Sequence, residues 1–267
     1  MIDWFSGSSN AIKRVSDVVC WLVLVLVFFV AGCEQRYEEE VSHPPLVAPG
    51  FVIPDYASRA IEAGGGLDTW VKTEQIRVGC VATFYQPNGS FYLTEQHYEI
   101  YPWLNSIRIS AKEPQGEFAW QLSKGQFSVL EGARRVDVLP VAMCERWFAE
   151  AILNITTAPA RFLDESVEFR KASEPVKIEG QWYYSIERVA PHKTGIWSKA
   201  VFYQNRNNSL VDMLWFADVN GERFLAVRGY DYRRIGKDGV LVPTKIEILN
   251  ADALDALRER LVKIDFE

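Results

Sequence analysis

The sequence predicts a mainly β (α+β) fold built on one strongly curved antiparallel sheet of about ten or eleven strands. Most of the chain after residue 75 alternates apolar and polar residues with a period of two, as half-buried strands do. Turn sequences such as Pro87-Asn88-Gly89 and Asn220-Gly221 separate these segments. Aromatic residues make up 13% of the chain, with nine Trp, and this favours β structure or an apolar pocket.

The folded part is expected to begin near Asp55 with a short helix. Asp55 can cap this helix, and Gly64-Gly65-Gly66 is expected to end it, because glycine terminates helices readily. A short turn or second helix over Leu67–Lys72 then presents Trp70. An antiparallel meander of about five strands is expected between Gln75 and Leu130.

The pattern changes in the middle of the chain. Leu139–Leu153 lacks glycine and has helical spacing, and it is apolar enough to be largely buried. Strand patterns resume over Val167–Leu249, a short helix is expected over Asn250–Leu257, and Arg260–Phe266 forms the last strand. Composition does not break across the strands, so a single domain is expected over residues 55–267. A flat open sheet of this size would expose long edges, so the sheet is expected to curve around the central helix or a ligand.

The first 32 residues are organised like a signal peptide. Lys13 and Arg14 form a short positive region, and the apolar run Val18–Gly32 follows. The run ends in Val30-Ala31-Gly32-Cys33, which resembles the bacterial lipobox, where the cysteine receives a diacylglycerol before cleavage. We therefore predict a lipoprotein signal peptide over residues 1–32 and lipidation of Cys33. The alternative is an uncleaved N-terminal anchor.

Residues 33–54 are expected to be the lipidated cysteine and a flexible tether. Glu38-Glu39-Glu40 and several prolines stay extended and bury little apolar area. The residue after the cysteine is Glu34, whereas an Asp there would favour the inner membrane in the enterobacterial sorting rule. The prediction is a lipid-anchored protein of the bacterial outer membrane that faces the periplasm.

Two cysteines, Cys80 and Cys144, lie in the predicted domain. An exported protein with two spare cysteines can join them in a disulfide. The alternative is two buried free thiols, since cysteine is common in protein cores.

The sequence argues against an enzyme, a metal site and a nucleic-acid-binding protein, and it implies no cofactor. His43, His97 and His192 are far apart, and there is no HExxH, GxSxG or CxxC motif, so a hydrolase is only a residual alternative. His97 alternates with Glu95 and Glu99, which a solvated strand face explains better than a metal patch. The net charge of −6 lacks the basic excess of proteins that bind nucleic acids.

The order of these segments resembles the LolA/LolB family of lipoprotein carriers over most of residues 56–266. The resemblance rests on four features: the helix ending at Gly64-Gly65-Gly66 before Trp70, Glu113-Pro114-Gln115-Gly116 between the third and fourth strands, Arg146-Trp147-Phe148 in the central helix, and the ending Val242-Pro243-Thr244-Lys245-Ile246-Glu247-Ile248 before the last strand.

This resemblance implies an unclosed antiparallel β half-barrel with helices as a lid or plug over an apolar cavity. A lipid-anchored member is similar to LolB, in which a leucine protrudes between the third and fourth strands. Gln115 stands there in this chain, and Trp103-Leu104, one hairpin earlier, could supply a membrane-facing apolar tip instead. The aromatic residues expected to line the cavity are Phe84, Phe91, Trp120, Phe127, Phe148, Trp182, Tyr184, Trp215 and Phe224.

The predicted function is that of a membrane-anchored, non-enzymatic envelope lipoprotein. It would bind lipid or the acyl chains of lipoproteins in an apolar cavity, for lipoprotein sorting or lipid transport. The alternative is a structural or protein-interaction lipoprotein of the envelope whose core is filled and whose partner is a protein. The sequence leaves open whether the aromatic residues line a cavity or fill a core.

Overall fold

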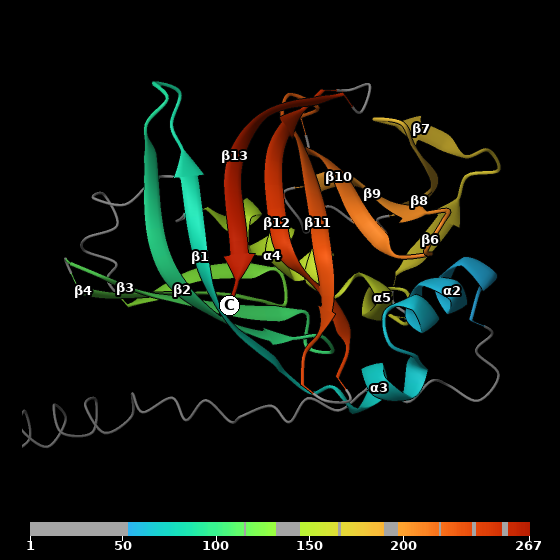
Figure 1. The fold of residues 1–267 in the computed structure, drawn as a ribbon, viewed down its shortest axis with the longest axis horizontal. Coiled ribbons are helices and arrows are strands. Elements are labelled where there is room, and N and C mark those ends of the chain that lie inside the picture. The colour runs from blue at the N-terminus through green and yellow to red at the C-terminus, as the bar shows by residue number, and fades with distance from the viewer. Residues whose placement is uncertain are drawn as a thin grey trace, which may run out of the picture. The chain divides into compact units, whose positions relative to one another are not determined.

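The computed structural model describes residues 53–114, 116–131, 145–164, 167–189, 197–218, 220–236, 239–252 and 256–267. They form one antiparallel sheet of thirteen strands and four short helices (Figure 1). The predicted signal peptide, Cys33 and the tether as far as residue 52 lie outside the described residues. The helices are α2 (Asp55–Ala63), α3 (Leu67–Lys72), α4 (Arg146–Thr156) and α5 (Ala158–Arg161).

The strands are β1 (Ile76–Tyr85), β2 (Phe91–Tyr101), β3 (Ser106–Glu113), β4 (Gly116–Ser123), β5 (Gln126–Glu131), β6 (Glu168–Lys171), β7 (Val176–Ile178), β8 (Gln181–Val189), β9 (Trp197–Asn205), β10 (Val211–Asp218), β11 (Phe224–Arg234), β12 (Leu241–Ala251) and β13 (Leu257–Phe266). Their order is β5-β4-β3-β2-β1-β13-β12-β11-β10-β9-β8-β6, and β7 pairs with β8 off this path. The last strand, β13, therefore joins the N-terminal meander to the C-terminal strands. The sheet is not closed.

The expected count of ten or eleven strands is too low. Thirteen strands pair, and two of them are as short as three or four residues: β6 and β7 hydrogen-bond one after the other along the same edge of β8. The partner strand satisfies backbone groups that so short a segment could not satisfy alone.

The helix over Asp55–Ala63 forms as predicted, but its cap differs. Pro54 occupies the N-cap, and Asp55 instead pairs with Arg59 one turn later at 3.0 Å. At the other end the amide of Gly65 donates to the carbonyl of Glu62 and the amide of Gly66 to that of Ile61. This is a Schellman ending, and the positive φ angles of both glycines permit it.

Two other helix boundaries differ from expectation. The central helix begins at Arg146 and ends at Thr156, whereas residues 139–144 of the predicted Leu139–Leu153 helix lie outside the described residues. The helix expected over Asn250–Leu257 is wrong. Strand β12 continues to Ala251, which pairs with Leu257 of β13, and the amide of Ala256 donates to the Asp252 carboxylate to close the turn.

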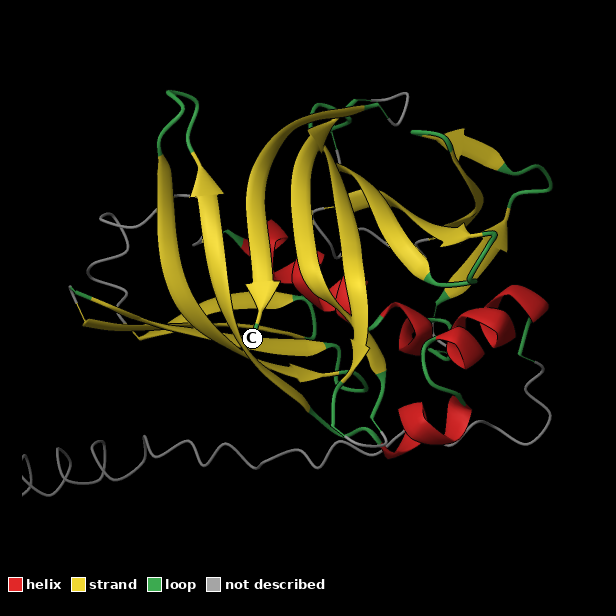
Figure 2. Ribbon diagram, viewed as in Figure 1, coloured by secondary structure: helices red, strands yellow, loops and turns green. Residues whose placement is uncertain are grey.

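The strands curve so that one face of the sheet encloses α4, and we call this the concave face (Figure 2). Side chains alternate between the two faces along each strand. The larger hydrophobic cluster fills the concave side, and a smaller one lies on the opposite, convex side of β8, β9 and β10. The structure thus has two hydrophobic clusters, one on each face of the sheet, whereas the sequence predicts only a concave one.

Candidate functional site: the concave face and helix α4

The wall of the concave face comes from the alternation that the sequence predicts. In β1 the side chains Ile76, Val78, Cys80, Ala82 and Phe84 are buried, and those between them are exposed or half-buried. The same period of two continues in β2, β3 and β4. Because neighbouring strands are paired in register, these residues form one buried surface, which is apolar except for Thr94 and Gln96 of β2.

Helix α4 fills this surface. Every residue from Trp147 to Thr156 is buried, and the helix contacts strands on both sides of the curve, from β3 and β4 to β10, β11 and β12. The Phe148 ring lies on the Phe84 ring of β1, with 5.2 Å between the centroids. A helix that is buried on all sides belongs to the core of the fold.

Four of the predicted cavity residues come together here. Phe84 and Trp120 belong to the wall and are each 1% exposed, and Phe127 of β5 is half-buried against the same cluster. Phe148 is also buried, but it lies on α4 and not on the sheet. It is therefore part of the filling and not of the wall.

The other predicted residues lie elsewhere. Trp215 and Phe224 stack on each other on the convex side, with 5.3 Å between the ring centroids, whereas the neighbours of Trp215 in β10, Leu214 and Phe216, belong to the concave cluster together with Val211. Phe91 is 63% exposed and Trp182 is 44% exposed. Tyr184 is half-buried beyond the edge of the concave core. The nine aromatic residues that the sequence predicts for the cavity therefore do not line a single surface.

Helix α4 carries a buried charged group into the core. The Arg146 Nε donates to the Glu150 Oε1 at 2.7 Å, and Glu150 is 8% exposed. Burial raises the pKa of the Glu150 carboxyl, whereas Arg146 and the largely buried Arg188 act in the opposite direction. Burial likewise lowers the pKa of Arg188, and Glu150 partly restores it. Desolvation of both charges thus reduces what the ion pair contributes to the docked helix.

Several buried indoles around α4 have no acceptor. The Nε1 atoms of Trp70, Trp120 and Trp147 are buried without a hydrogen-bond partner. A buried donor without a partner costs about 1–3 kcal/mol. The residues of α4 from Trp147 to Thr156 are thus all buried, but several buried polar groups in this core have no hydrogen-bond partner.

The turn between β2 and β3 is tied to this core. Arg161 of α5 donates to the carbonyl of Pro102, and burial lowers the pKa of its guanidinium to about 10. Trp103 and Leu104 are half-buried, and the Trp103 ring packs against the concave cluster. Their membrane-facing role stays a prediction. The corresponding position between β3 and β4, Gln115, lies outside the described residues.

Solved structures with this architecture identify the fold. The LolA superfamily protein NE2245 from Nitrosomonas europaea matches with a TM-score of 0.53 at 15% sequence identity, over 79% of this chain and 91% of its own. The fold is LolA-like. No protein-family model matches the chain, and no curated protein matches it in sequence.

Two further structures are more distant. One is a putative outer membrane lipoprotein-sorting protein domain from Vibrio parahaemolyticus, with a TM-score of 0.45, 11% identity, and 79% of this chain and 88% of its own covered. The other is a DUF1329 family protein from Desulfovibrio piger, with a TM-score of 0.45, 9% identity, and coverages of 80% and 91%. The resemblance predicted from segment order is confirmed for the fold, and at such identities a fold does not specify a ligand.

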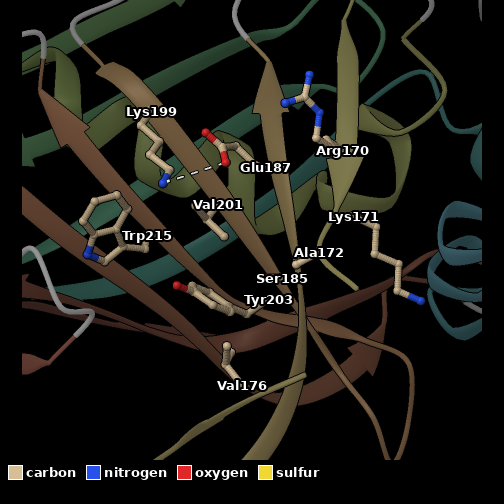
Figure 3. Close-up of a pocket in the computed structure, with 10 residues that line it drawn as sticks. All are labelled: Arg170, Lys171, Ala172, Val176, Ser185, Glu187, Lys199, Val201, Tyr203 and Trp215. Carbon is tan, nitrogen blue, oxygen red and sulfur yellow. Dashed lines mark ion pairs between the residues drawn. The ribbon is translucent and has the colours of Figure 1, made fainter. Parts of the chain in front are cut away.

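The convex side of the LolA-like domain carries a pocket that the sequence did not predict. It has a volume of about 310 Å³ and an aromatic floor with a charged rim (Figure 3). Lys199 pairs with Glu187 at 3.8 Å and lies 5.8 Å from the centre of the Trp215 ring. The residues that line it are Arg170, Lys171, Ala172, Val176, Ser185, Glu187, Lys199, Val201, Tyr203 and Trp215.

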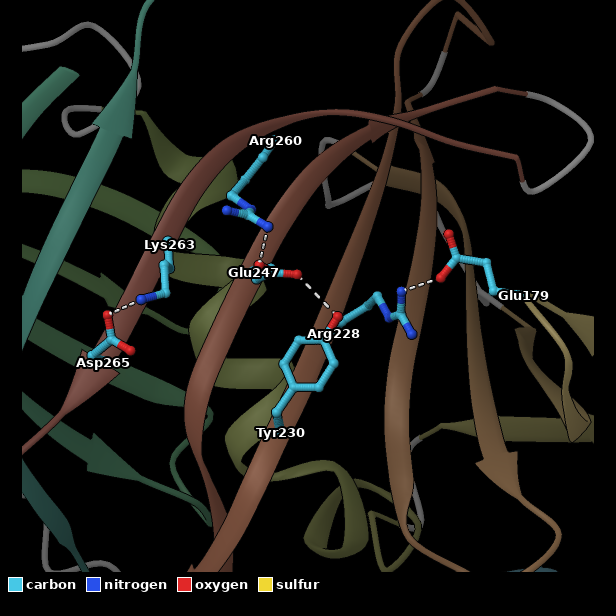
Figure 4. A network of polar contacts seen from close by, with 7 residues as sticks. All are labelled: Glu179, Arg228, Tyr230, Glu247, Arg260, Lys263 and Asp265. Atoms are coloured by element: carbon cyan, nitrogen blue, oxygen red, sulfur yellow. Dashed lines mark hydrogen bonds and ion pairs between the residues drawn. The ribbon is translucent and has the colours of Figure 1, made fainter. Parts of the chain in front are cut away.

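A polar network covers the middle of the same convex side (Figure 4). Arg228 pairs with Glu179, Tyr230 donates to Glu247 at 2.9 Å, and Arg260 pairs with Glu247 at 2.5 Å. Charges of both signs are matched within the network, so it stabilises neighbouring strands and does not present one sign of charge to a partner.

Cys80 is a buried free thiol, and burial raises its pKa to about 12, whereas Cys144 lies outside the described residues, so the disulfide stays a prediction. The side chains of Glu95 and His97 are exposed, as expected for a solvated strand face. Within the described residues, no group of three His, Cys, Asp or Glu could hold a metal ion. No described helix is long and apolar enough to cross a membrane.

Proposed function

We propose that this chain is a non-catalytic, membrane-anchored envelope protein that binds lipid or the acyl chains of lipoproteins on its concave face. In this proposal α4 is a plug that the acyl chain displaces. The observation that carries it is the position of α4, an apolar helix that occupies the enclosed face of an unclosed LolA-like sheet.

The contacts of α4 favour exchange with an apolar ligand. The helix has 11 residues and no side-chain cap at its N-terminus, and an isolated helix of this length is marginal in water. Docking it buries Glu150 with Arg146 and leaves the indoles of Trp120 and Trp147 without acceptors. An acyl chain brings no charge to the wall and gains about 0.8 kcal/mol for each methylene that it buries.

The anchoring part of the proposal rests on the sequence of the N-terminus. Lipidation of Cys33 would hold the domain at the outer membrane, on the periplasmic side. Labelled palmitate should be incorporated into the full chain in a bacterial host and should be absent from Cys33→Ala. Equal labelling of both chains would contradict lipidation at this residue.

The binding part is tested by native mass spectrometry of residues 34–267 after incubation with palmitate. Phe148→Ala removes the contact of the plug with Phe84 and should weaken docking by about 3–5 kcal/mol. Because the apparent affinity rises with the fraction of open molecules, more palmitate should be bound. Phe127→Glu and Trp120→Glu place a charge on the wall and should reduce palmitate binding. Plug and wall variants thus have opposite effects.

Trp215→Ala is the matched control, since it alters a buried Trp on the convex side. It should leave the palmitate mass excess unchanged. Phe127 is half-buried on β5, so Phe127→Glu keeps the test valid if Trp120→Glu fails to fold. A chain that stays free of palmitate in the wild type and in Phe148→Ala would contradict the proposal.

A second candidate function is that of a structural or protein-interaction protein of the envelope. The complete burial of α4 favours it, because a core that is permanently filled needs no ligand. It predicts that Phe148→Ala lowers stability without adding any bound lipid, and that a defined envelope protein copurifies with the full chain.

A further inference from the structure

Five side chains form a strip on the outer edge of the sheet, beyond the concave core. Lys177 of β7 pairs in register with Trp182 of β8, and the amide of Arg206 donates to the carbonyl of Trp182. Lys171 of β6 pairs with Ile186, a residue of the concave cluster. Alternation therefore places all of them on the same side of the sheet as that cluster. Lys171 also borders the convex pocket, but its side chain points away from Glu187, Lys199 and Trp215 of that pocket (Figure 3). We call Lys171, Lys177, Trp182, Tyr184 and Arg206 the β8 strip.

The cations of the β8 strip lie over its aromatic rings. The Lys171 ammonium is 3.9 Å and the Arg206 guanidinium 5.4 Å from the centre of the Tyr184 ring, and Lys177 is 5.9 Å from that of Trp182. None of the three cations forms an ion pair with another described residue, in contrast to the matched charges of the convex network. The strip thus presents net positive charge.

The aromatic residues of the strip are accessible. Trp182 is 44% exposed, Tyr184 is half-buried, and Lys177 and Arg206 are exposed. Rings of Trp and Tyr favour the boundary between water and lipid, where one end is apolar and the other is hydrated. Lysine and arginine stems can lie along apolar surface while their charged ends reach phosphates.

The strip lies close to the point where the chain enters the domain. Gln204, the register partner of Tyr184, donates to the carbonyl of Tyr56 in the first turn of α2. Tyr56 in turn donates to the carbonyl of Phe169 in β6, and Figure 1 shows α2 beside β6. If Cys33 is lipidated, as the proposed function holds, about 20 residues separate it from this edge, a reach of at most about 70 Å.

We propose that the β8 strip binds the headgroup region of an anionic phospholipid surface and orients the domain on it. Lys171, Lys177 and Arg206 neutralise lipid phosphates, and Trp182 enters the boundary between headgroups and acyl chains. The occupant is a lipid surface and not an acidic protein segment, because an acidic segment does not account for a Trp exposed between the cations. The proposal concerns how the domain sits on a membrane and not what its concave face holds.

The test is cosedimentation of residues 34–267 with two kinds of vesicle, phosphatidylcholine alone and phosphatidylcholine with an equal part of phosphatidylglycerol. The wild type should bind only the anionic vesicles. The double variant Lys177→Gln, Arg206→Gln should bind them about fivefold more weakly for each cation removed, since a cation near an anionic surface contributes about 1 kcal/mol. Trp182→Ser should also weaken binding, and added salt should weaken it further.

Arg77→Gln and Phe91→Ser are the matched controls, because both residues are highly exposed and lie far from the strip on β1 and β2. Both controls should bind as the wild type does, and unchanged thermal unfolding should show that all variants fold. Equal binding of the strip variants and the wild type would overturn the proposal, as would loss of binding in Phe91→Ser alone. So would strip variants that lose binding only to a glutamate-rich peptide.

This test can fail independently of the acyl-chain test. Vesicle binding is read from sedimentation, whereas the proposed function is read from the mass of bound palmitate. A domain that carries palmitate and ignores anionic vesicles would retain its proposed function and lose only the role of the strip.

Discussion

At the scale of single residues, Glu150 of α4 should make the stability of the fold depend on pH. Burial raises its pKa above the ordinary value of 4.5, so the folded chain holds the proton more tightly than the unfolded chain. Stability is therefore lost as pH rises from about the unfolded pKa through the raised folded pKa. Glu150→Gln removes this titration. Relative to the wild type, its free energy of unfolding in urea should increase as pH rises through that interval.

The control is Glu95→Gln, which changes an exposed carboxyl on β2. Its free energy of unfolding should follow that of the wild type at every pH. Parallel pH profiles for Glu150→Gln and the wild type would show that burial does not govern this carboxyl.

Cys80 gives a second prediction at this scale. A thiol whose pKa is about 12 holds almost no thiolate at neutral pH, and the thiolate is the reactive form. Iodoacetamide should therefore leave Cys80 unmodified in the folded chain and modify it after unfolding without reductant, as mass spectrometry can measure. Modification that needs both unfolding and a reductant would instead establish the disulfide with Cys144.

Single residues also show where sequence reasoning about the site was limited. Phe84 and Trp120 lie on the concave wall, as the period of two in their strands predicts, and their contact with a ligand stays a prediction. Trp215 lies on the convex side instead, because β10 reads as a nearly continuous apolar run and is buried on both faces. A run of this kind does not reveal which side chains face which cluster.

At the scale of the elements, the ending of α2 depends on glycine. Gly65 has a φ of 121°, a conformation that side chains rarely adopt, and it donates in the Schellman ending. Gly65→Ala should lower the free energy of unfolding by about 1–3 kcal/mol. Urea unfolding measures this loss.

Gly79→Ala is the comparison within a strand. Its backbone is not in the left-handed region, and an added Cβ would meet only ordinary contacts, the nearest at 3.5 Å from Glu267. We expect no loss of stability, since glycine inside a strand is unfavourable by about 0.5–1 kcal/mol. A loss as large as that of Gly65→Ala would show that the backbone angle is not the cause.

Periodicity predicted most elements correctly, and its failure over Asn250–Leu257 has a local cause. Those residues read as a short helix, yet Ala251 of β12 pairs with Leu257 of β13, and the Trp215 Nε1 donates to the carbonyl of Asp252. A partner strand and a distant indole decide the conformation there. Neither is visible within a window of neighbouring residues.

At the scale of the whole molecule, β13 holds the two parts of the sheet together. It pairs with β1 on one side and β12 on the other, and its residues Val262 and Ile264 are fully buried. A chain that ends at residue 256 should lose cooperative unfolding, because among the described strands only β13 pairs the meander with the C-terminal strands. Circular dichroism during heating measures this, and removal of Glu267 alone is the control. A cooperative transition in the shorter chain would contradict the central role of β13.

The central claim is that an acyl chain replaces α4 on the concave face, and hydrogen exchange tests it most directly. Amide exchange of residues 34–267 is followed by mass spectrometry with and without palmitate. The account predicts that palmitate makes the amides of α4 exchange faster while those of β1 stay protected. Protection of α4 that is unchanged or greater in the presence of palmitate would contradict the claim and favour a permanently filled core.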